Sequence, residues 1–224
     1  MRELIVNADD FGLADGVNEG IIEAHVRGIL TSTSLMVGRP AAVDAARLAR
    51  AHPGLSVGLH YEEDGPEIDK PGHAARTFAA QLARFRELTG TEPTHVDSHH
   101  HVHMTRMATF APLVAPLGVP LRGDGRVAYL GDFYAQPRRG VVELDRVRTP
   151  SLLELLSAVD AAAEFVELGC HPARVTDDLH SSYAGEREVE LATLTYPDLR
   201  ARIESLGFAL ASYHNSRARR LPHG

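Results

Sequence analysis

The stretch Arg2-Glu3-Leu4-Ile5-Val6-Asn7-Ala8-Asp9-Asp10-Phe11-Gly12 joins an apolar run to two adjacent carboxylates. A short apolar run that ends in a glycine-containing loop predicts a buried strand over residues 2–8. The two aspartates then follow a core strand, which is where active-site side chains gather in α/β proteins. An isolated Asp-Asp pair more often caps a helix or forms a turn, so its interpretation depends on what ends the other strands.

The segments that follow alternate between two patterns. Apolar and β-branched runs predict strands over residues 31–37, 55–60, 163–168 and 208–213, and helical spacing predicts helices over residues 15–27, 40–52, 74–88, 107–117, 151–159, 188–195 and 197–206. Residues 61–72 and 177–185 are predicted as polar loops, and no pattern assigns residues 121–140. This alternation favours a parallel sheet with helices packed outside it.

The run Thr94-His95-Val96-Asp97-Ser98-His99-His100-His101-Val102-His103 contains five of the chain's 13 histidines. In an extended strand, side chains alternate between faces, so His95, Asp97, His99, His101 and His103 are expected on one face. Imidazoles and a carboxylate together can bind a divalent metal, with Asp97 or a neighbouring histidine orienting a ligand. The alternative is a solvated polar loop, or histidines that bond backbone groups.

Polar side chains of the types that bind metals end several predicted strands. Asp9 and Asp10 follow the first strand, His60 ends the third, His99 lies in the histidine-rich run, and His171 follows residues 163–168. Because parallel strands end at the same edge, these side chains are expected to meet at one rim. Two histidines and a carboxylate leave coordination positions open for water and substrate, which indicates a catalytic metal site.

The remaining polar residues at this rim have types suited to proton transfer. One of the two aspartates could bind the metal while the other stays free as a base, and His171 could act as an acid. The simpler interpretation of His171 is a turn residue before Pro172. His214 follows the last predicted strand and could either line the site or belong to the tail.

Composition narrows the class of protein. The 224 residues are 44% hydrophobic and 24% charged, which predicts one globular domain with a sizeable core. A net charge of -7 gives no general attraction to nucleic acid or to an anionic membrane, and the basic end Arg217, Arg219 and Arg220 is interpreted as solvated. The single cysteine, Cys170, excludes an intrachain disulfide, and with no leader-like or membrane-length apolar run a cytoplasmic location is expected.

The motifs resemble those of the YdjC/ChbG family of carbohydrate deacetylases. The matching blocks are Asn7–Gly12, Gly28–Met36, Val57–His60, Thr94–His103 and His171–Pro172. They occur in order over about three quarters of the chain. The resemblance implies an α/β fold, a distorted (β/α) TIM-like barrel, formed as a single domain by residues 1–224.

The resemblance also implies an activity and a set of roles. The expected reaction is removal of the N-acetyl group from an acetylated amino sugar or a glycoconjugate. One divalent metal is expected on Asp10, His60 and His99, with Asp9 as general base and His171 as general acid. Spacing alone allows His101 in place of His99. The family resemblance implies Mg²⁺, whereas the ligand types suit Zn²⁺ or another transition metal.

The expected partner is a small acetylated sugar, without nucleic acid or membrane, and the sequence leaves a homodimer open. The acidic segment Tyr61–Pro66 departs from the apolar, threonine-rich stretch common in the family, so the sugar itself is not identified. Two other functions compete with this one. The first is another metal-dependent hydrolase on a similar barrel, such as a phosphoesterase or a cyclic amidohydrolase. The second is a metal-binding module without turnover.

Overall fold

The computed structural model describes residues 1–63 and 65–215, so Asp64 and the basic end Arg217, Arg219 and Arg220 lie outside the described residues. Its strands form one seven-stranded sheet in the order β4-β3-β2-β1-β6-β5, with β7 also paired to β1. All of the pairings are parallel. The strands are β1 (Arg2–Phe11), β2 (Ser32–Leu35), β3 (Ser56–Tyr61), β4 (Val96–Ser98), β5 (Ala128–Leu130), β6 (Phe165–Cys170) and β7 (Phe208–Ala211).

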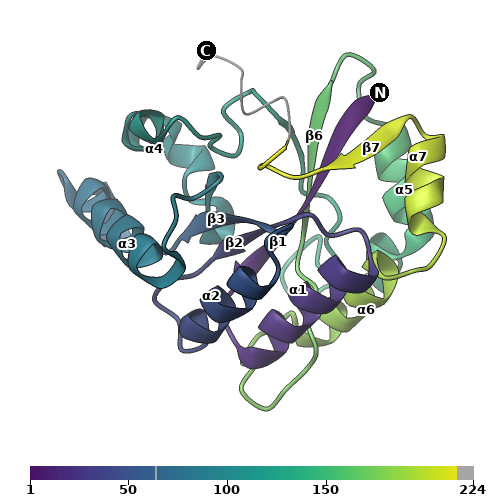
Figure 1. The fold of residues 1–224 in the computed structure, drawn as a ribbon, viewed down its shortest axis with the longest axis horizontal. Coiled ribbons are helices and arrows are strands. Elements are labelled where there is room, and N and C mark those ends of the chain that lie inside the picture. The colour runs from purple at the N-terminus through teal and green to yellow at the C-terminus, as the bar shows by residue number, and fades with distance from the viewer. Residues whose placement is uncertain (64, 216–224) are drawn as a thin grey trace.

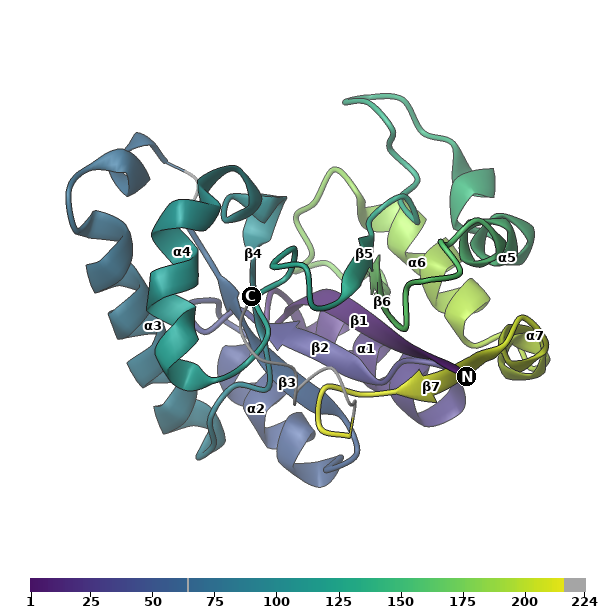
Figure 2. The same cartoon turned by 90° about the horizontal axis from the view of Figure 1, so that it is seen from above.

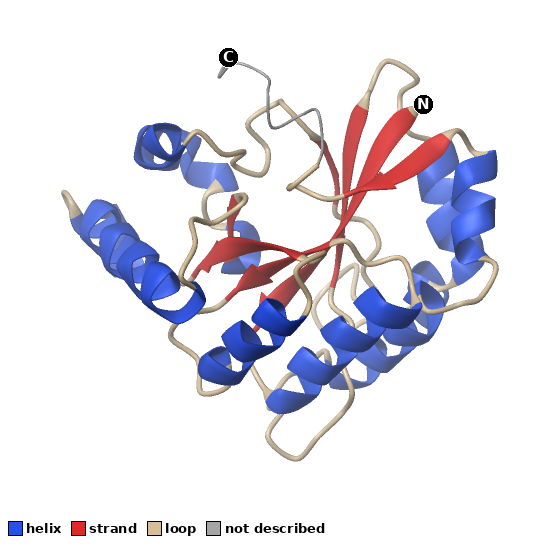
Figure 3. Cartoon of the chain, in the orientation of Figure 1, coloured by secondary structure: helices blue, strands red, loops and turns tan. Residues whose placement is uncertain are grey.

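Helices surround the outside of the curled sheet (Figure 1, Figure 3). They are α1 (Asp15–Arg27), α2 (Ala42–Ala51), α3 (His73–Thr89), α4 (Met107–Val114), α5 (Thr149–Ser157), α6 (Ala184–Leu194) and α7 (Leu199–Ser205). Seen from above, the strands lie between α3 and α4 on one side and α5, α6 and α7 on the other (Figure 2). The predicted fold class, a distorted (β/α) barrel, is therefore confirmed.

Strand β1 is the centre of the sheet and explains its distortion. One edge of β1 pairs with β6 from Glu3 to Ala8. The other edge is shared, because residues 2–5 pair with β7 and residues 7–11 pair with β2. Two strands that share one edge must diverge, so the barrel opens on this side. Leu4, Ile5, Val6 and Ala8 are fully buried, as their apolar run predicts.

The register between β1 and β2 shifts between Ala8 and Phe11, where β1 carries Asp9 and Asp10. Asp10 has a positive φ of 69°, a conformation that side chains other than glycine rarely adopt. The predicted strand over residues 2–8 therefore continues to Phe11 through an irregularity. Such irregularities commonly turn a side chain toward a site.

The expectation that residues 95–103 form one strand face is wrong. The strand β4 ends at Ser98, and a 3₁₀ turn follows over His99–His101. His100 and His101 both have a φ of 53°, so the backbone turns sharply and side-chain alternation is lost. The rule that residues two apart in a strand share one face therefore does not apply to His99 and His101.

Residues 121–140, which no sequence pattern assigned, complete the sheet. Leu121 forms a single parallel bridge with Val96 of β4, and the three residues of β5 pair with β6. Gly123 and Gly125 have positive φ values of 79° and 88° between these two contacts. The strand is too short, and its surroundings too irregular, to give a period in the sequence.

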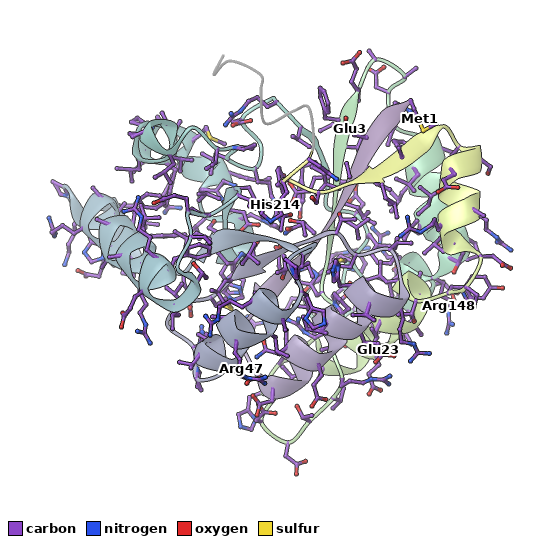
Figure 4. All side chains as sticks on the ribbon, in the orientation of Figure 1. Met1, Glu3, Glu23, Arg47, Arg148 and His214 are labelled. Atoms are coloured by element: carbon purple, nitrogen blue, oxygen red, sulfur yellow. The ribbon has the colours of Figure 1, made fainter. Side chains whose placement is uncertain are left out.

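The charged side chains Glu23, Arg47 and Arg148 lie with the outer helices (Figure 4). Within residues 1–63 and 65–215, no helix has both the length and the apolar character needed to cross a bilayer.

The close contact between α1 and Ala173, in the segment after β6, can be tested by substitution. A Cβ atom on Gly20 would lie 2.5 Å from Cα of Ala173, which is backbone and cannot move aside freely. We expect Gly20→Ala to destabilise the fold by about 1–3 kcal/mol through overpacking. The exposed Gly185 of α6 has nothing within 4 Å of its Cβ position, so Gly185→Ala should be neutral or stabilising by up to about 1 kcal/mol. Urea unfolding gives the free energy of unfolding of both variants. If Gly20→Ala were as stable as Gly185→Ala, the close packing of Gly20 against Ala173 would be contradicted.

Candidate active site

A cavity of about 690 Å³ opens at the carboxyl ends of the strands, and all five residues predicted from the sequence line it. Asp9 and Asp10 come from the end of β1, and His60 comes from β3. His99 comes from the turn after β4, and His171 directly follows β6. Residues that are far apart in the chain therefore meet at one rim, because their strands run in parallel and end there.

Asp10, His60 and His99 lie close enough together to hold a metal ion. Oδ1 of Asp10 is 3.4 Å from Nε2 of His60 and 3.1 Å from Nδ1 of His99. Ligand atoms at about 2.1 Å from a metal are separated by roughly 3.0–3.4 Å in octahedral or tetrahedral sites. Nε2 of His60 is buried without a hydrogen-bond partner in the described structure. The donor set and the spacing therefore fit a divalent cation.

Asp10 is held as an anion with one oxygen directed to the histidines. Its other oxygen, Oδ2, accepts a 2.6 Å hydrogen bond from Nη2 of Arg187 on α6. Burial opposes ionisation of Asp10, but the charge of Arg187 and the two histidines outweigh it and hold the pKa of this carboxyl well below its usual value. The ionised oxygen Oδ1 of Asp10 is therefore placed to bind a cation together with the two imidazoles.

His60 is oriented from behind by Asp97. Nδ1 of His60 lies 2.7 Å from Oδ1 of Asp97, which fixes the ring and leaves Nε2 directed to Asp10. Burial opposes a charge on His60, but Asp97 and Asp10 raise its pKa to about 10. A metal bound at Nε2 would require this ring nitrogen to be deprotonated.

The neighbouring Asp9 has different partners. Its two oxygens accept hydrogen bonds of 2.7 and 2.9 Å from Arg122, and Oδ1 also accepts one of 3.0 Å from Asn7. Burial opposes ionisation of Asp9, but the charge of Arg122 outweighs it, so the pKa of Asp9 is lowered. The two adjacent aspartates are thus separated by their partners, with Asp10 facing the histidines and Asp9 facing the arginine.

A second set, Asp9, His60 and Asp97, also has ligand atoms within metal-binding distance of one another. Its carboxylates are already engaged, because Asp97 Oδ2 accepts a 2.6 Å hydrogen bond from Ser34 and lies 2.8 Å from Nη2 of Arg122. A cation there would have to compete with a buried guanidinium. The geometry favours the set of Asp10, His60 and His99.

The histidines of residues 94–103 occupy separate environments. His101 lies beside Tyr129, with Nε2 3.4 Å from the phenol oxygen, and also lines the cavity. His95 stacks on Tyr213 with 4.1 Å between ring centroids, and His103 bonds Ser98 and the carbonyl of residue 122. His99 is the member of this run that approaches Asp10.

His171 lies against two tyrosines at the cavity wall. Its ring makes edge contacts with Tyr134 and Tyr183, at centroid distances of 5.4 and 5.8 Å. Its Nδ1 is buried without a hydrogen-bond partner among residues 1–63 and 65–215, and it is 4.0 Å from Oε1 of Glu190. Burial lowers the pKa of His171 to about 4, so the ring is neutral at pH 7, in contrast to a histidine with its ordinary value.

Several residues of this site were missed by the sequence analysis. Arg122 lies in residues 121–140, where no local pattern marks it. Arg187 and Glu190 lie on α6, which starts at Ala184 and not at residue 188 as predicted. These two residues are three apart, so a helix that starts at Ala184 places both on one face. A helix with the correct start would have indicated from the sequence that they act at one place.

His214 does not line this cavity. It lines a separate hollow of about 430 Å³ with Leu55, Val57 and Thr94, at the amino ends of β3 and β4. Figure 4 shows His214 beyond the end of β7. Of the two interpretations from the sequence, a position in the active site is therefore wrong.

The carboxylates and histidines lie at the carboxyl ends of a parallel barrel, where (β/α) barrel enzymes carry their active sites. The chain belongs to the YdjC-like family, because the family model described as YdjC-like protein matches residues 3–62 and 67–205. The resemblance seen in the motifs is confirmed.

Named relatives match almost the whole chain. A chitooligosaccharide deacetylase of Klebsiella pneumoniae is 36% identical, covering 96% of this chain and 99% of its own length. A carbohydrate deacetylase of Geobacillus stearothermophilus is 37% identical, covering 95% and 97%. These relatives support a hydrolytic deacetylase.

Solved structures share the fold. A crystal structure from Enterococcus faecalis, described as a candidate cellobiose-phosphate cleavage protein, is 27% identical with a TM-score of 0.80, covering 95% of this chain and 98% of its own. A family 4 carbohydrate esterase from Streptomyces lividans, in complex with acetate, is 14% identical with a TM-score of 0.59, covering 96% and 95%. The second likeness concerns the fold alone.

The contribution of the ion pairs of Arg122 to the free energy of unfolding can be measured. Asp9 has a folded pKa below its unfolded value, so its interaction with Arg122 stabilises the fold above about pH 4 and is lost as the pH falls. Arg122→Met leaves buried carboxylates without their cation, which should cost about 3–5 kcal/mol at pH 7.5. The loss should shrink at pH 4.5, because the stranded carboxyls take up protons.

Urea unfolding at both pH values, with chelator present, measures this loss. Arg86→Met is the control, because Arg86 pairs with Glu92 at the surface, and this variant should unfold like the wild type. A loss for Arg122→Met that is independent of pH would contradict the assigned electrostatics.

Proposed function

We propose that this protein hydrolyses the N-acetyl group of an acetylated amino sugar, or of a glycoconjugate that carries one, and releases acetate. The observation that carries the proposal is the convergence of Asp9, Asp10, His60, His99 and His171 on one cavity. The names of the relatives, chitooligosaccharide deacetylase and carbohydrate deacetylase, support the same reaction.

In this proposal, Asp10, His60 and His99 hold one divalent metal. When bound there, such an ion would polarise the acetyl carbonyl and lower the pKa of water. The imidazole and carboxylate donors suit Zn²⁺ or another transition metal, and the family resemblance implies Mg²⁺. The cytoplasmic location, the homodimer and the single-domain organisation stay predictions from the sequence.

The chain's own residues move the protons. Asp9 takes a proton from water as the oxygen forms a bond to the acetyl carbon. Arg122 keeps this carboxylate ionised and fixed in orientation, so the base is available at neutral and mildly acidic pH. The carbon–nitrogen bond then breaks, and the nitrogen takes a proton from His171. Because His171 is neutral at pH 7, its ring takes up a proton on the other nitrogen as it gives this one. The products are acetate and a free amine.

The proposal predicts a product that can be measured directly. Protein loaded with Zn²⁺, Co²⁺ or Mg²⁺ should convert N-acetylglucosamine oligomers to species lighter by one acetyl group, with equimolar acetate. A panel that also contains phosphorylated disaccharides and cyclic amides tests the rival hydrolases. Phosphate release without acetate would replace the proposed reaction, and metal binding with no turnover on the whole panel would favour a binding module.

The metal ligands are tested by substitution. Asp10→Ala, His60→Ala and His99→Ala should each lose stoichiometric metal on elemental analysis, since each removes one of three protein donors. His101→Ala is the matched control, because this ring lies in the same turn but against Tyr129, and should retain the metal. Retention in His99→Ala together with loss in His101→Ala would move the ligand role to His101.

The role of Asp9 is tested by a neutral substitution of the same shape. Asp9→Asn should keep the metal, because the ligand set does not include Asp9, and should lose turnover by about 10²–10⁴-fold. Elemental analysis and the acetate assay on one preparation separate the two effects. Loss of metal from Asp9→Asn would show that Asp9 is a ligand and not the base.

A further inference from the structure

Glu190 is a fully buried carboxyl group that the proposed mechanism does not yet use. It lies on α6 with no exposed surface. Among the described residues, no arginine or lysine forms an ion pair with it. A buried carboxyl without a cation is costly unless it is hydrogen-bonded or holds a proton.

The partners of Glu190 tie it to His171. Oε2 accepts a 2.5 Å hydrogen bond from the backbone N–H of His171, and Oε1 accepts one of the same length from the hydroxyl of Tyr183. Oε1 also lies 4.0 Å from Nδ1 of His171, and within the described part of the chain Nδ1 has no hydrogen-bond partner. The carboxyl is therefore fixed at two points beside the ring, and His171 lines the cavity whereas Glu190 is not among its lining residues.

The 4.0 Å separation is longer than a hydrogen bond. Hydrogen bonds between catalytic groups are often long in a ligand-free protein and tighten when substrate binds. Nδ1 is buried, and Glu190 has no exposed surface, so the gap between Nδ1 and Oε1 lies inside the protein. The arrangement is that of a proton-transfer group with an orienting partner behind it.

Extending the proposed function, on which this step rests, we propose that Glu190 and Nδ1 of His171 share one proton, so that Nε2 keeps its own proton toward the cavity. Glu190 is then the positioning residue of the acid. When Nε2 gives its proton to the departing nitrogen, the shared proton moves fully to Nδ1. The ring ends neutral and Glu190 ends ionised, so the charge balances.

The electrostatics of the pair agree with this geometry. Burial raises the pKa of Glu190 to about 7 and lowers that of His171 to about 4, so of the two groups the carboxyl holds a proton more tightly than Nδ1. A neutral ring beside a carboxylic acid carries its own proton on Nε2. The other titratable groups around Glu190 are Tyr183 and Arg187 of its own segment, Tyr134, Cys170 of β6 and Asp9 of β1.

Leaving-group dependence distinguishes this role from a merely structural one. Glu190→Gln should slow hydrolysis of an N-acetyl amide by about 10–100-fold, as loss of an orienting partner commonly does. It should change hydrolysis of an acetyl ester with a nitrophenol leaving group much less, because that group departs without a proton. Glu186→Gln is the matched control on the same helix, since Glu186 bonds Gln136, and both of its rates should equal the wild type.

A double-mutant cycle tests the route of action. If Glu190 acts through His171, then Glu190→Gln added to His171→Ala should cause no further loss of amide hydrolysis. Equal losses on amide and ester, losses that multiply in the double variant, or no loss in Glu190→Gln would each overturn the proposal.

A measurement without substrate tests the shared proton of Glu190 and His171 independently of the proposed deacetylase function. In the ¹⁵N spectrum of wild-type protein, with His171 assigned by comparison with His171→Asn, we expect a protonated Nε2 and an Nδ1 shift that changes in Glu190→Gln. A ring protonated on Nδ1 alone, or an Nδ1 shift unaffected by Glu190→Gln, would overturn the shared proton. Absence of acetate release by wild-type protein would instead count against the proposed function, and the spectrum would still test the pair.

Discussion

The buried guanidinium of Arg122 connects the parts of the barrel on which the candidate site depends. Its nitrogens contact Asp9 of β1, Asp97 of β4 and Glu167 of β6, at distances of 2.6–2.9 Å, and its side chain is 1% exposed. These strands are brought together by one cation at the axis of the sheet. Because an uncompensated buried charge is expensive, the cation and its carboxylates hold one another in place.

This interaction also contributes to the net charge of the buried groups in and beside the cavity. The buried carboxylates Asp9, Asp10, Asp97 and Glu167 face two buried guanidinium groups, Arg122 and Arg187. When all are ionised, two negative charges remain. Asp97 and Asp10 raise the pKa of His60 to about 10, and burial raises the pKa of Glu167. A divalent cation beside Asp10 would supply the missing charge directly.

The sequence was informative wherever a polar residue ended an apolar strand. This rule identified Asp9, Asp10, His60 and His171. The carboxyl ends of parallel strands lie at one edge of the sheet, and this does not depend on the conformation of the loops. His99 could not be separated from His101 by spacing, because the backbone turns through positive φ values at His100 and His101. That choice came from the family resemblance, and the structure shows why alternation could not supply it.

Arg122 could not be predicted. It follows a single bridging residue, Leu121, in a segment with glycines and no periodicity, and its importance arises from contacts with residues 45 and 113 positions away. Glu190 was assigned to a helix, but only its contact with His171 gives it a role. Arg122 and Glu190 orient other residues through contacts between segments that are distant in the sequence, so their roles follow from packing, whereas Asp97 was indicated by its place among the histidines.

The most direct test of the account is anomalous X-ray diffraction from crystals grown with Co²⁺. The account predicts one strong peak bounded by Oδ1 of Asp10, Nε2 of His60 and Nδ1 of His99, with Arg122 still bonded to both oxygens of Asp9. A peak among Asp9, His60 and Asp97, with Arg122 displaced, would contradict the separation of the two aspartates. The absence of any peak in this cavity at saturating Co²⁺ would contradict the metal centre itself.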